Sequence, residues 1–329
     1  MNFPFDVYLL ALAGAFGVSL LAVPWWREVC RRAGLVDDPG HRKIHETPIP
    51  LAGGFGVLTG MVVPLMIGAA AVHWNLPSLK PAHGLLEHGL SRRGIELLVI
   101  ILGAFGIVIT GWLDDKHELR PLAKFGGQLA VALLVAVANV RITLFVHSVV
   151  FSYAVTILWI LTVINAFNFM DNMNGLCAGM GAISAWSFAL IAALEGQYLV
   201  TLIGLLACGA LLGFLPYNFP RATVFLGDTG SHLVGYLLAV MAILPHFYTA
   251  QNPRPWAVLT PLLILAVPLG DLAWVVLLRW RKGQPFYQGD TNHLSHRLVK
   301  WGWSRQGAVL LIWLLTAVFG GLAVLLMLG

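Results

Sequence analysis

Ten stretches of mostly apolar residues, each close to 20 residues long, recur along this chain and are separated by short polar segments. They lie at residues 6–26, 51–74, 94–113, 125–141, 149–169, 176–195, 198–218, 231–249, 256–279 and 306–328. A helix needs about 20 apolar residues to cross a hydrocarbon core of roughly 30 Å. The pattern therefore predicts an all-α, polytopic integral membrane protein with about ten transmembrane helices.

The composition agrees with this prediction. Hydrophobic residues make up 58% of the 329 positions and charged residues only 11%, and the mean hydropathy is +0.81. A water-soluble domain of this length does not have that balance. No internal repeat or change of composition divides the chain, so residues 1–329 are predicted to form a single transmembrane domain.

The basic residues predict the orientation of the helices. All lysines and arginines except Lys80, Arg92, Arg93, Arg141 and Arg254 fall on one side of the ten predicted spans. Loops that stay in the cytoplasm carry the basic excess, so this side is predicted to be cytoplasmic, with five loops, and both termini are predicted to lie outside. The net charge of +5 is explained by this topology and by contact with anionic lipid, and nucleic-acid binding is not expected.

The predicted cytoplasmic loops also hold most of the unusual polar residues. Four of them carry acidic or imidazole groups, namely Asp114 with Asp115, Asp171, Asp228, and Asp290 with His293 and His296. Hard oxygen ligands suit Mg²⁺ or Mn²⁺, and magnesium usually completes its coordination with water and substrate phosphate. The pattern therefore predicts a magnesium site for a phosphorylated substrate at one membrane face.

Each of these loops also has a simpler interpretation. Asp114 and Asp115 fit a solvated helix end, and the Asn-rich segment 165–175 fits a turn. Asp228, between two glycines before a span, fits either a helix N-cap or a helix N-terminus that offers its amides to phosphate. The two histidines fit a solvated helix face. Four such loops on one face favour a shared functional site over four separate structural explanations.

Asp271 stands apart because it lies inside the ninth predicted span. Pro268 and Gly270 precede it, and these residue types can break a membrane helix and free backbone groups. We interpret Asp271 as a structural cap for such a break rather than as a catalytic residue.

The ordered set of motifs resembles the polyprenyl-phosphate N-acetylhexosamine-1-phosphate transferases, of the glycosyltransferase family 4 type, over essentially the whole chain. The motifs are Asp114-Asp115, the segment Asn165 to Gly175, Gly227-Asp228-x-Gly230-Ser231, Asp290-x-x-His293-x-x-His296-Arg297, and Arg42, His45, Pro50 and Gly53-Gly54 in the first inner loop. The final motif is more similar to the undecaprenyl-phosphate GlcNAc-1-phosphate transferase branch than to the phospho-MurNAc-pentapeptide translocase.

The resemblance implies a reaction. A sugar-1-phosphate, with N-acetylglucosamine as the expected sugar, passes from a UDP-N-acetylhexosamine to polyprenyl (undecaprenyl) phosphate, with release of UMP, and this starts cell-wall or surface polysaccharide synthesis. It implies an Mg²⁺-dependent enzyme, with Mn²⁺ as an alternative ion, in the cell inner (plasma) membrane with its active site on the cytoplasmic face. The family also makes a homodimer an expected assembly.

The resemblance also implies residue roles. The expected catalytic residues are Asp114, Asp115, Asp171, Asp228, His293 and His296, and the expected metal ligands among them are Asp228 and Asp115. The expected substrate contacts are His45, Lys124, Asn168, Asn174, Phe225 and Arg297. Two departures stand out, since Asn174 replaces a second acid found in many relatives and Ser295 stands where relatives often have another histidine.

Two other classes of protein remain as alternatives. An ion-coupled membrane transporter would place acidic groups within its spans, often in broken helices of related halves. Another Mg²⁺-dependent membrane phosphotransferase, such as a CDP-alcohol phosphotransferase, would concentrate its ligands on one or two adjacent helices.

Overall fold

A computed structural model describes residues 5–39, 47–74, 83–143, 146, 148–245, 247, 255–285 and 291–328. The helices are α1 (Phe5–Arg32), α2 (Gly53–His73), α3 (His83–His117), α4 (Pro121–Val137), α5 (Val149–Met170), α6 (Leu176–Leu194), α7 (Tyr198–Asn218), α8 (Gly227–Met241), the 3₁₀ segment η2 (Pro255–Leu259), α9 (Thr260–Ile264), α10 (Ala266–Arg281), α11 (Leu294–Lys300) and α12 (Arg305–Leu328). The short strands β1 (Val36–Asp37) and β2 (Ile49–Pro50) pair antiparallel.

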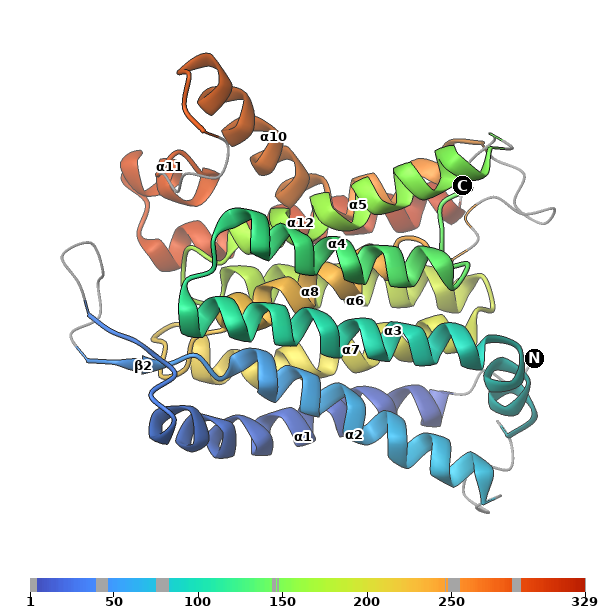
Figure 1. The fold of residues 1–329 in the computed structure, drawn as a ribbon. Coiled ribbons are helices and arrows are strands. Elements are labelled where there is room, and N and C mark those ends of the chain that lie inside the picture. The colour runs from blue at the N-terminus through green and yellow to red at the C-terminus, as the bar shows by residue number, and fades with distance from the viewer. Residues whose placement is uncertain are drawn as a thin grey trace.

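The helices form a bundle (Figure 1), and many large apolar side chains are exposed on it. Leu21, Ile95 and Leu325 are 77%, 78% and 63% exposed, as expected for side chains that face lipid. Seven described helices are long and apolar enough to cross a membrane, or eight if the bent pair Pro255–Ile264 and Ala266–Arg281 is one span. The all-α polytopic class is therefore confirmed. The prediction of ten crossings remains a prediction, because α4 and α8 have only 17 and 15 residues.

Helix α8 lies at the centre of the bundle and is buried along nearly its whole length. It packs against α2, α3, α5 and α6. Its first turn therefore lies among the ends of several other helices, where the polar residues predicted to be functional are found.

Two predicted boundaries were wrong. Residues 83–93 were expected to belong to an outer loop, but they form the first part of α3, which has a kink at Arg93. The apolar pattern does not include these charged residues. A helix does not need apolar side chains to continue, so α3 extends beyond the apolar stretch. Helix α8 begins at Gly227 rather than at residue 231, because the glycine-rich motif forms its first turn instead of a loop.

The ninth predicted span, residues 256–279, is broken, as its proline and glycine indicated. The two parts are bent by 73°, and α9 ends at Ile264. Pro268 has no N–H to bond the carbonyl four residues earlier, which is that of Ile264, so the helix cannot continue unchanged. Beyond the break, α10 diverges from the bundle (Figure 1). Asp271 does not cap this break, since its carboxylate bonds to α11 instead.

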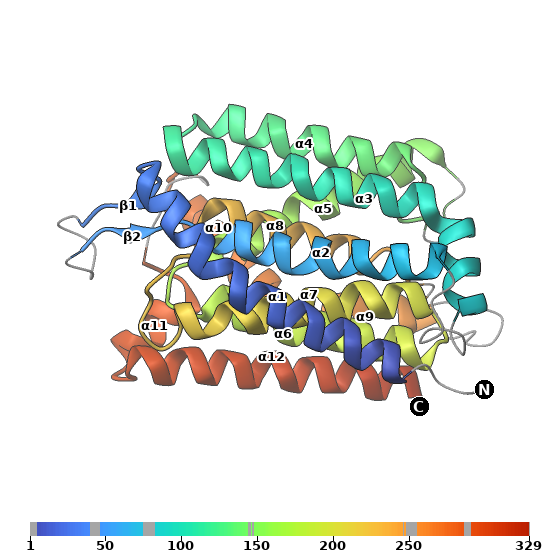
Figure 2. The same ribbon diagram turned by 90° about the horizontal axis from the view of Figure 1, so that it is seen from below.

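Both ends of the described chain lie at the same end of the bundle, as both views show (Figure 2). The β1–β2 hairpin and α11 lie at the opposite end. This arrangement agrees with an even number of crossings. Which end faces the cytoplasm remains a prediction from the basic residues.

Candidate active site

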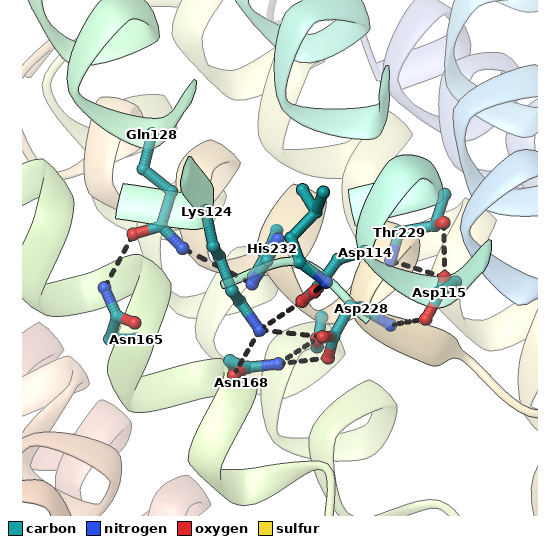
Figure 3. A network of polar contacts seen from close by, with 11 residues as sticks. Asp114, Asp115, Lys124, Gln128, Asn165, Asn168, Asp228, Thr229 and His232 are labelled. Carbon is teal, nitrogen blue, oxygen red and sulfur yellow. Dashed lines mark hydrogen bonds and ion pairs between the residues drawn. The ribbon is translucent and has the colours of Figure 1, made fainter. Parts of the chain in front are cut away.

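Four helix ends bring their polar side chains together around the ammonium group of Lys124 (Figure 3). Lys124, in the first turn of α4, lies 2.7 Å from Oδ2 of Asp114 and 2.7 Å from Oδ2 of Asp228. Asn168, in the last turn of α5, donates from its amide nitrogen to Oδ1 of Asp228 at 2.6 Å and to the Ser231 hydroxyl at 3.0 Å. The lysine therefore offsets the charge of two carboxylates that come from different helices.

The carboxylate of Asp114 is fixed at both oxygens. Its Oδ1 accepts a hydrogen bond from the backbone N–H of Leu119 at 2.9 Å, just after the end of α3. Its Oδ2 faces Lys124, and the side chain is only 9% exposed. The Leu119 amide and Lys124 therefore hold the Asp114 carboxylate in a set orientation, so Asp114 is not a solvated residue at a helix end.

Asp115 has a different role in the structure. Its Oδ1 accepts from the backbone N–H of Asp228 at 2.8 Å, and its Oδ2 accepts from the N–H of Thr229 at 3.0 Å and the Thr229 hydroxyl at 2.5 Å. Asp115 thus caps α8 from a neighbouring helix and places Asp228. In the structure both amides donate to Asp115, so the alternative in which they bind phosphate stays a prediction that would require these bonds to be exchanged.

Two glycines permit this close approach of α3 and α8. Gly227 has a φ of +72°, and a Cβ at this position would lie 2.8 Å from Oδ2 of Asp115. A Cβ at Gly111 in α3 would lie 2.5 Å from the Cα of Thr229. Larger side chains at either position would separate Asp115 from the helix end that it caps.

Asp171 follows α5 directly and adds a further acid to this end of the bundle. Burial, and then the negative charges of Asp228 and Asp115, raise the pKa of Asp171 to about 8. The site of the metal-free protein therefore retains a proton on Asp171 at neutral pH.

A second polar layer lies one helical turn deeper and was not predicted from the sequence. Asn165 donates to Oε1 of Gln128 at 2.8 Å, and Nε2 of Gln128 lies 3.4 Å from Nε2 of His232. Gln128 and His232 are 1% and 0% exposed. The available signal was spacing, because Gln128 follows Lys124 by four residues and His232 follows Asp228 by four, which puts each pair on one helix face.

Helix α11 is attached to the site by its inner face. The Ser295 hydroxyl donates to Oδ1 of Asn172 at 2.6 Å, which connects α11 to the segment after α5. The His293 ring lies edge-on to the Phe169 ring with centroids 5.6 Å apart. Ser295, the departure from the pattern of relatives, therefore has a contact of its own within this region.

His296 and Arg297 do not join the carboxylate cluster. Burial, followed by the charges of His293, Lys300 and Arg305, lowers the pKa of His296. The Arg297 guanidinium lies 4.8 Å from the ring centre of Trp274 and 5.2 Å from that of Trp301. The expected phosphate contact of Arg297 remains a prediction, because its present partners are aromatic.

The remaining predicted substrate contacts lie at the edge of the cluster. Asn174 donates to the carbonyl of Pro220 at 3.4 Å, away from Asp228. Phe225 lies two residues before the start of α8, and its backbone N–H donates to the carbonyl of Pro50 at 2.9 Å. His45, like Arg42 and Asp290, lies outside the described residues.

Comparison with known proteins gives consistent matches, and the relatives cover nearly the whole chain. The family model described as glycosyl transferase family 4 matches residues 97–246. A Bacillus subtilis protein named as a probable undecaprenyl-phosphate N-acetylglucosaminyl 1-phosphate transferase is 31% identical, covering 98% of this chain and 86% of the relative. A Mycobacterium tuberculosis decaprenyl-phosphate N-acetylglucosaminephosphotransferase is 32% identical over 94% of this chain and 80% of its own. An Escherichia coli undecaprenyl-phosphate alpha-N-acetylglucosaminyl 1-phosphate transferase is 27% identical over 95% and 82%.

Proposed function

This chain belongs to glycosyl transferase family 4, and we propose on that basis that it transfers N-acetylglucosamine 1-phosphate from UDP-N-acetylglucosamine to a polyprenyl phosphate. An oxygen of the lipid phosphate forms a bond to the phosphorus that carries the sugar. The bond from that phosphorus to the bridging oxygen breaks, and UMP leaves with that oxygen. The product is a polyprenyl diphosphate sugar, a starting unit for surface polysaccharide.

The observation that carries this proposal is the convergence of Asp114, Lys124, Asn168 and Asp228 from four helices at one end of the bundle. Phosphoryl transfer needs positioning and charge stabilisation more than a protein nucleophile. A cluster that combines two carboxylates, an ammonium group and an amide offers both. Its place at a helix end lets a soluble nucleotide sugar and a membrane-bound phosphate meet.

The residues of the cluster have distinct tasks in this scheme. Lys124 and Asn168 provide N–H donors, and their partners are carboxylates that phosphate oxygens can replace. Asp114, held by the Leu119 amide, orients the lipid phosphate. It has little need to act as a base, since a phosphate monoester with a second pKa of about 6 has already lost most of that proton at pH 7.

The donor groups suit a magnesium ion that is coordinated partly by the protein and partly by the substrate. Asp228 and Asp114 offer carboxylate oxygens and Asn168 an amide oxygen, all hard ligands. The described residues contain no group of three His, Cys, Asp or Glu side chains arranged to hold a metal ion by themselves. Asp228 is the first candidate to hold the ion, whereas the metal role expected for Asp115 competes with its three bonds to α8. Bound there, magnesium supplies positive charge that offsets the charge of the diphosphate and of the departing UMP.

The protein is a multi-pass membrane protein, and the proposed reaction takes place at the cytoplasmic face of the cell membrane. The support is the basic excess on the side that carries α11 and the β1–β2 hairpin. Pairing of two chains as a homodimer stays a prediction.

The test uses the purified full chain in mild detergent with UDP-N-acetylglucosamine, polyprenyl phosphate and Mg²⁺. We expect UMP and a lipid-linked diphosphate sugar to form in equal amounts, formation to require both substrates, and EDTA to stop it until Mg²⁺ is restored. Asp228→Asn should abolish the reaction. Asp6→Asn, which changes an exposed acid in the first turn of α1, is the matched control and should leave it unchanged.

A negative result is equally clear. If no UDP-N-acetylhexosamine yields UMP in the presence of lipid phosphate and metal, the proposed function is wrong. A normal rate for Asp228→Asn would show that the cluster does not carry the reaction.

A further inference from the structure

Asp271 is a buried carboxylate whose partners all lie outside its own helix. The side chain is in α10, and the residue is 5% exposed. Its Oδ2 lies 2.7 Å from Nδ1 of His293, and its Oδ1 accepts a hydrogen bond from the backbone N–H of Leu294 at 2.6 Å. Asp271 therefore connects α10 to the residue just before α11 and to the first residue of that helix.

The contact determines which ring nitrogen of His293 is available. A carboxylate can only accept, so Nδ1 of His293 donates its proton to Asp271. The remaining nitrogen, Nε2, has no partner among the described residues. His293 is 5% exposed, so the ring is held by its surroundings and is not a solvated side chain.

The His293 ring lies against the end of α5, the helix that carries Asn168. It lies edge-on to Phe169, with ring centroids 5.6 Å apart. Phe169 directly follows Asn168, whose amide donates to Asp228. Ser295, two residues after His293, donates a hydrogen bond to Asn172, the residue that follows Asp171. A change in how α10 holds α11 therefore acts on groups next to the site.

We propose that Asp271 is a positioning residue for the transfer reaction. By accepting a hydrogen bond from the Nδ1–H of His293 it fixes the ring and leaves Nε2 for the phosphate groups of the substrates. When Nε2 also carries a proton and donates it to a phosphate oxygen, the carboxylate offsets the positive charge of the ring. The inference rests on the proposed function and adds to it a residue that orients His293.

A purely structural role for Asp271 is the competing explanation, because its other oxygen caps α11. The two roles can be separated by variants. Asp271→Asn keeps the size of the side chain but offers one acceptor to two donors. Leu294→Pro removes the capped N–H at the first helical position, where proline is favoured, and replaces the partly buried leucine side chain with a smaller apolar one. His293 has φ −60° and ψ 151°, which is compatible with a following proline.

The experiment measures kcat, KM for the UDP-sugar and the thermal unfolding midpoint of wild type, Asp271→Asn, His293→Ala, the double variant and Leu294→Pro. We expect Asp271→Asn to lower kcat about 10- to 100-fold, the usual effect of removing a residue that orients a functional histidine. Its unfolding midpoint should stay within a few degrees of wild type. The double variant should be no slower than His293→Ala alone, and Leu294→Pro should stay within a few-fold of wild type.

Three results would overturn the inference alone, each with an active wild type. The first is an unchanged kcat for Asp271→Asn. The second is a double variant whose fold-loss in kcat equals the product of the fold-losses of the two single variants. The third is a loss of kcat in Leu294→Pro equal to that in Asp271→Asn. The last would assign the effect to the helix cap. A wild type that is inactive with every donor would refute the proposed function and the inference with it.

Discussion

Replacing Gly227 with alanine should destabilise the protein mainly through Asp115. At this glycine φ is +72°, and a Cβ would lie 2.8 Å from Oδ2 of Asp115. A side chain in the left-handed region costs about 1–2 kcal/mol by itself. The carboxylate must also move away from the first turn of α8, whose amides and Thr229 hydroxyl it holds.

The size of the second effect follows from the contacts. Asp115 accepts three hydrogen bonds from α8. A hydrogen bond to a charged group contributes about 1.5–3 kcal/mol, so the loss of one brings the total cost to roughly 2.5–5 kcal/mol. Gly34→Ala is the matched control. Its φ is +67° and nothing lies within 4 Å of the added Cβ, so it carries the backbone cost alone.

The assay is thermal unfolding of both variants in the same mild detergent, with transfer activity as a second measurement. An extra cost of about 1.5–3 kcal/mol should lower the midpoint of Gly227→Ala by roughly 3–12 °C relative to Gly34→Ala, at about 2–4 °C per kcal/mol. Activity should fall at least about tenfold in Gly227→Ala, because Asp228 lies in the displaced turn. Equal midpoints for the two variants would refute the role assigned to Asp115.

Three further predictions concern neighbouring groups. In metal-free buffer the unfolded chain loses the Asp171 proton near pH 4, whereas the folded protein keeps it to about pH 8. This group therefore makes the stability of the folded protein fall as the pH rises from 4 to 8. The plot of stability against pH for Asp171→Asn should lack that part of the slope. Lys124→Met leaves two carboxylates without their shared cation; its midpoint should be lower than that of wild type and should rise more on addition of Mg²⁺, and an equal rise in both would contradict the assigned charge balance. Ser295→Ala leaves the Asn172 oxygen without its donor and should cost about 1–3 kcal/mol. Because Asn172 also donates to the Phe169 carbonyl, the test is a double-mutant cycle, in which Ser295→Ala with Asn172→Ala should lose less than the sum of the two single losses.

Much of the fold follows from the apolar pattern alone, because membrane-crossing helices need a minimum apolar length. The stretches 149–169 and 198–218 correspond to α5, Val149–Met170, and α7, Tyr198–Asn218. The pattern does not show where a helix continues in water, so the start of α3 was missed. It also assigned the glycine-rich start of α8 to a loop.

The site was only partly predictable from the sequence. Carboxylates at the ends of apolar stretches identified Asp114 and Asp228, and the family resemblance added Lys124 and Asn168. The different task of Asp115 depends on the packing of α3 against α8, which no local spacing reveals. The pairing of Asp271 in α10 with His293 just before α11 joins residues 22 positions apart on two different elements, and such a contact has no periodic signature.

The location of both chain ends at one end of the bundle makes the protein convenient to label. Helix α12 has 24 residues, which corresponds to about 36 Å at 1.5 Å per residue, and it ends away from the hairpin and α11. A fluorescent or affinity tag joined at either terminus is therefore separated from the carboxylate cluster by most of the thickness of the membrane. Reporters placed there can follow the protein in cells without entering the space where its substrates meet.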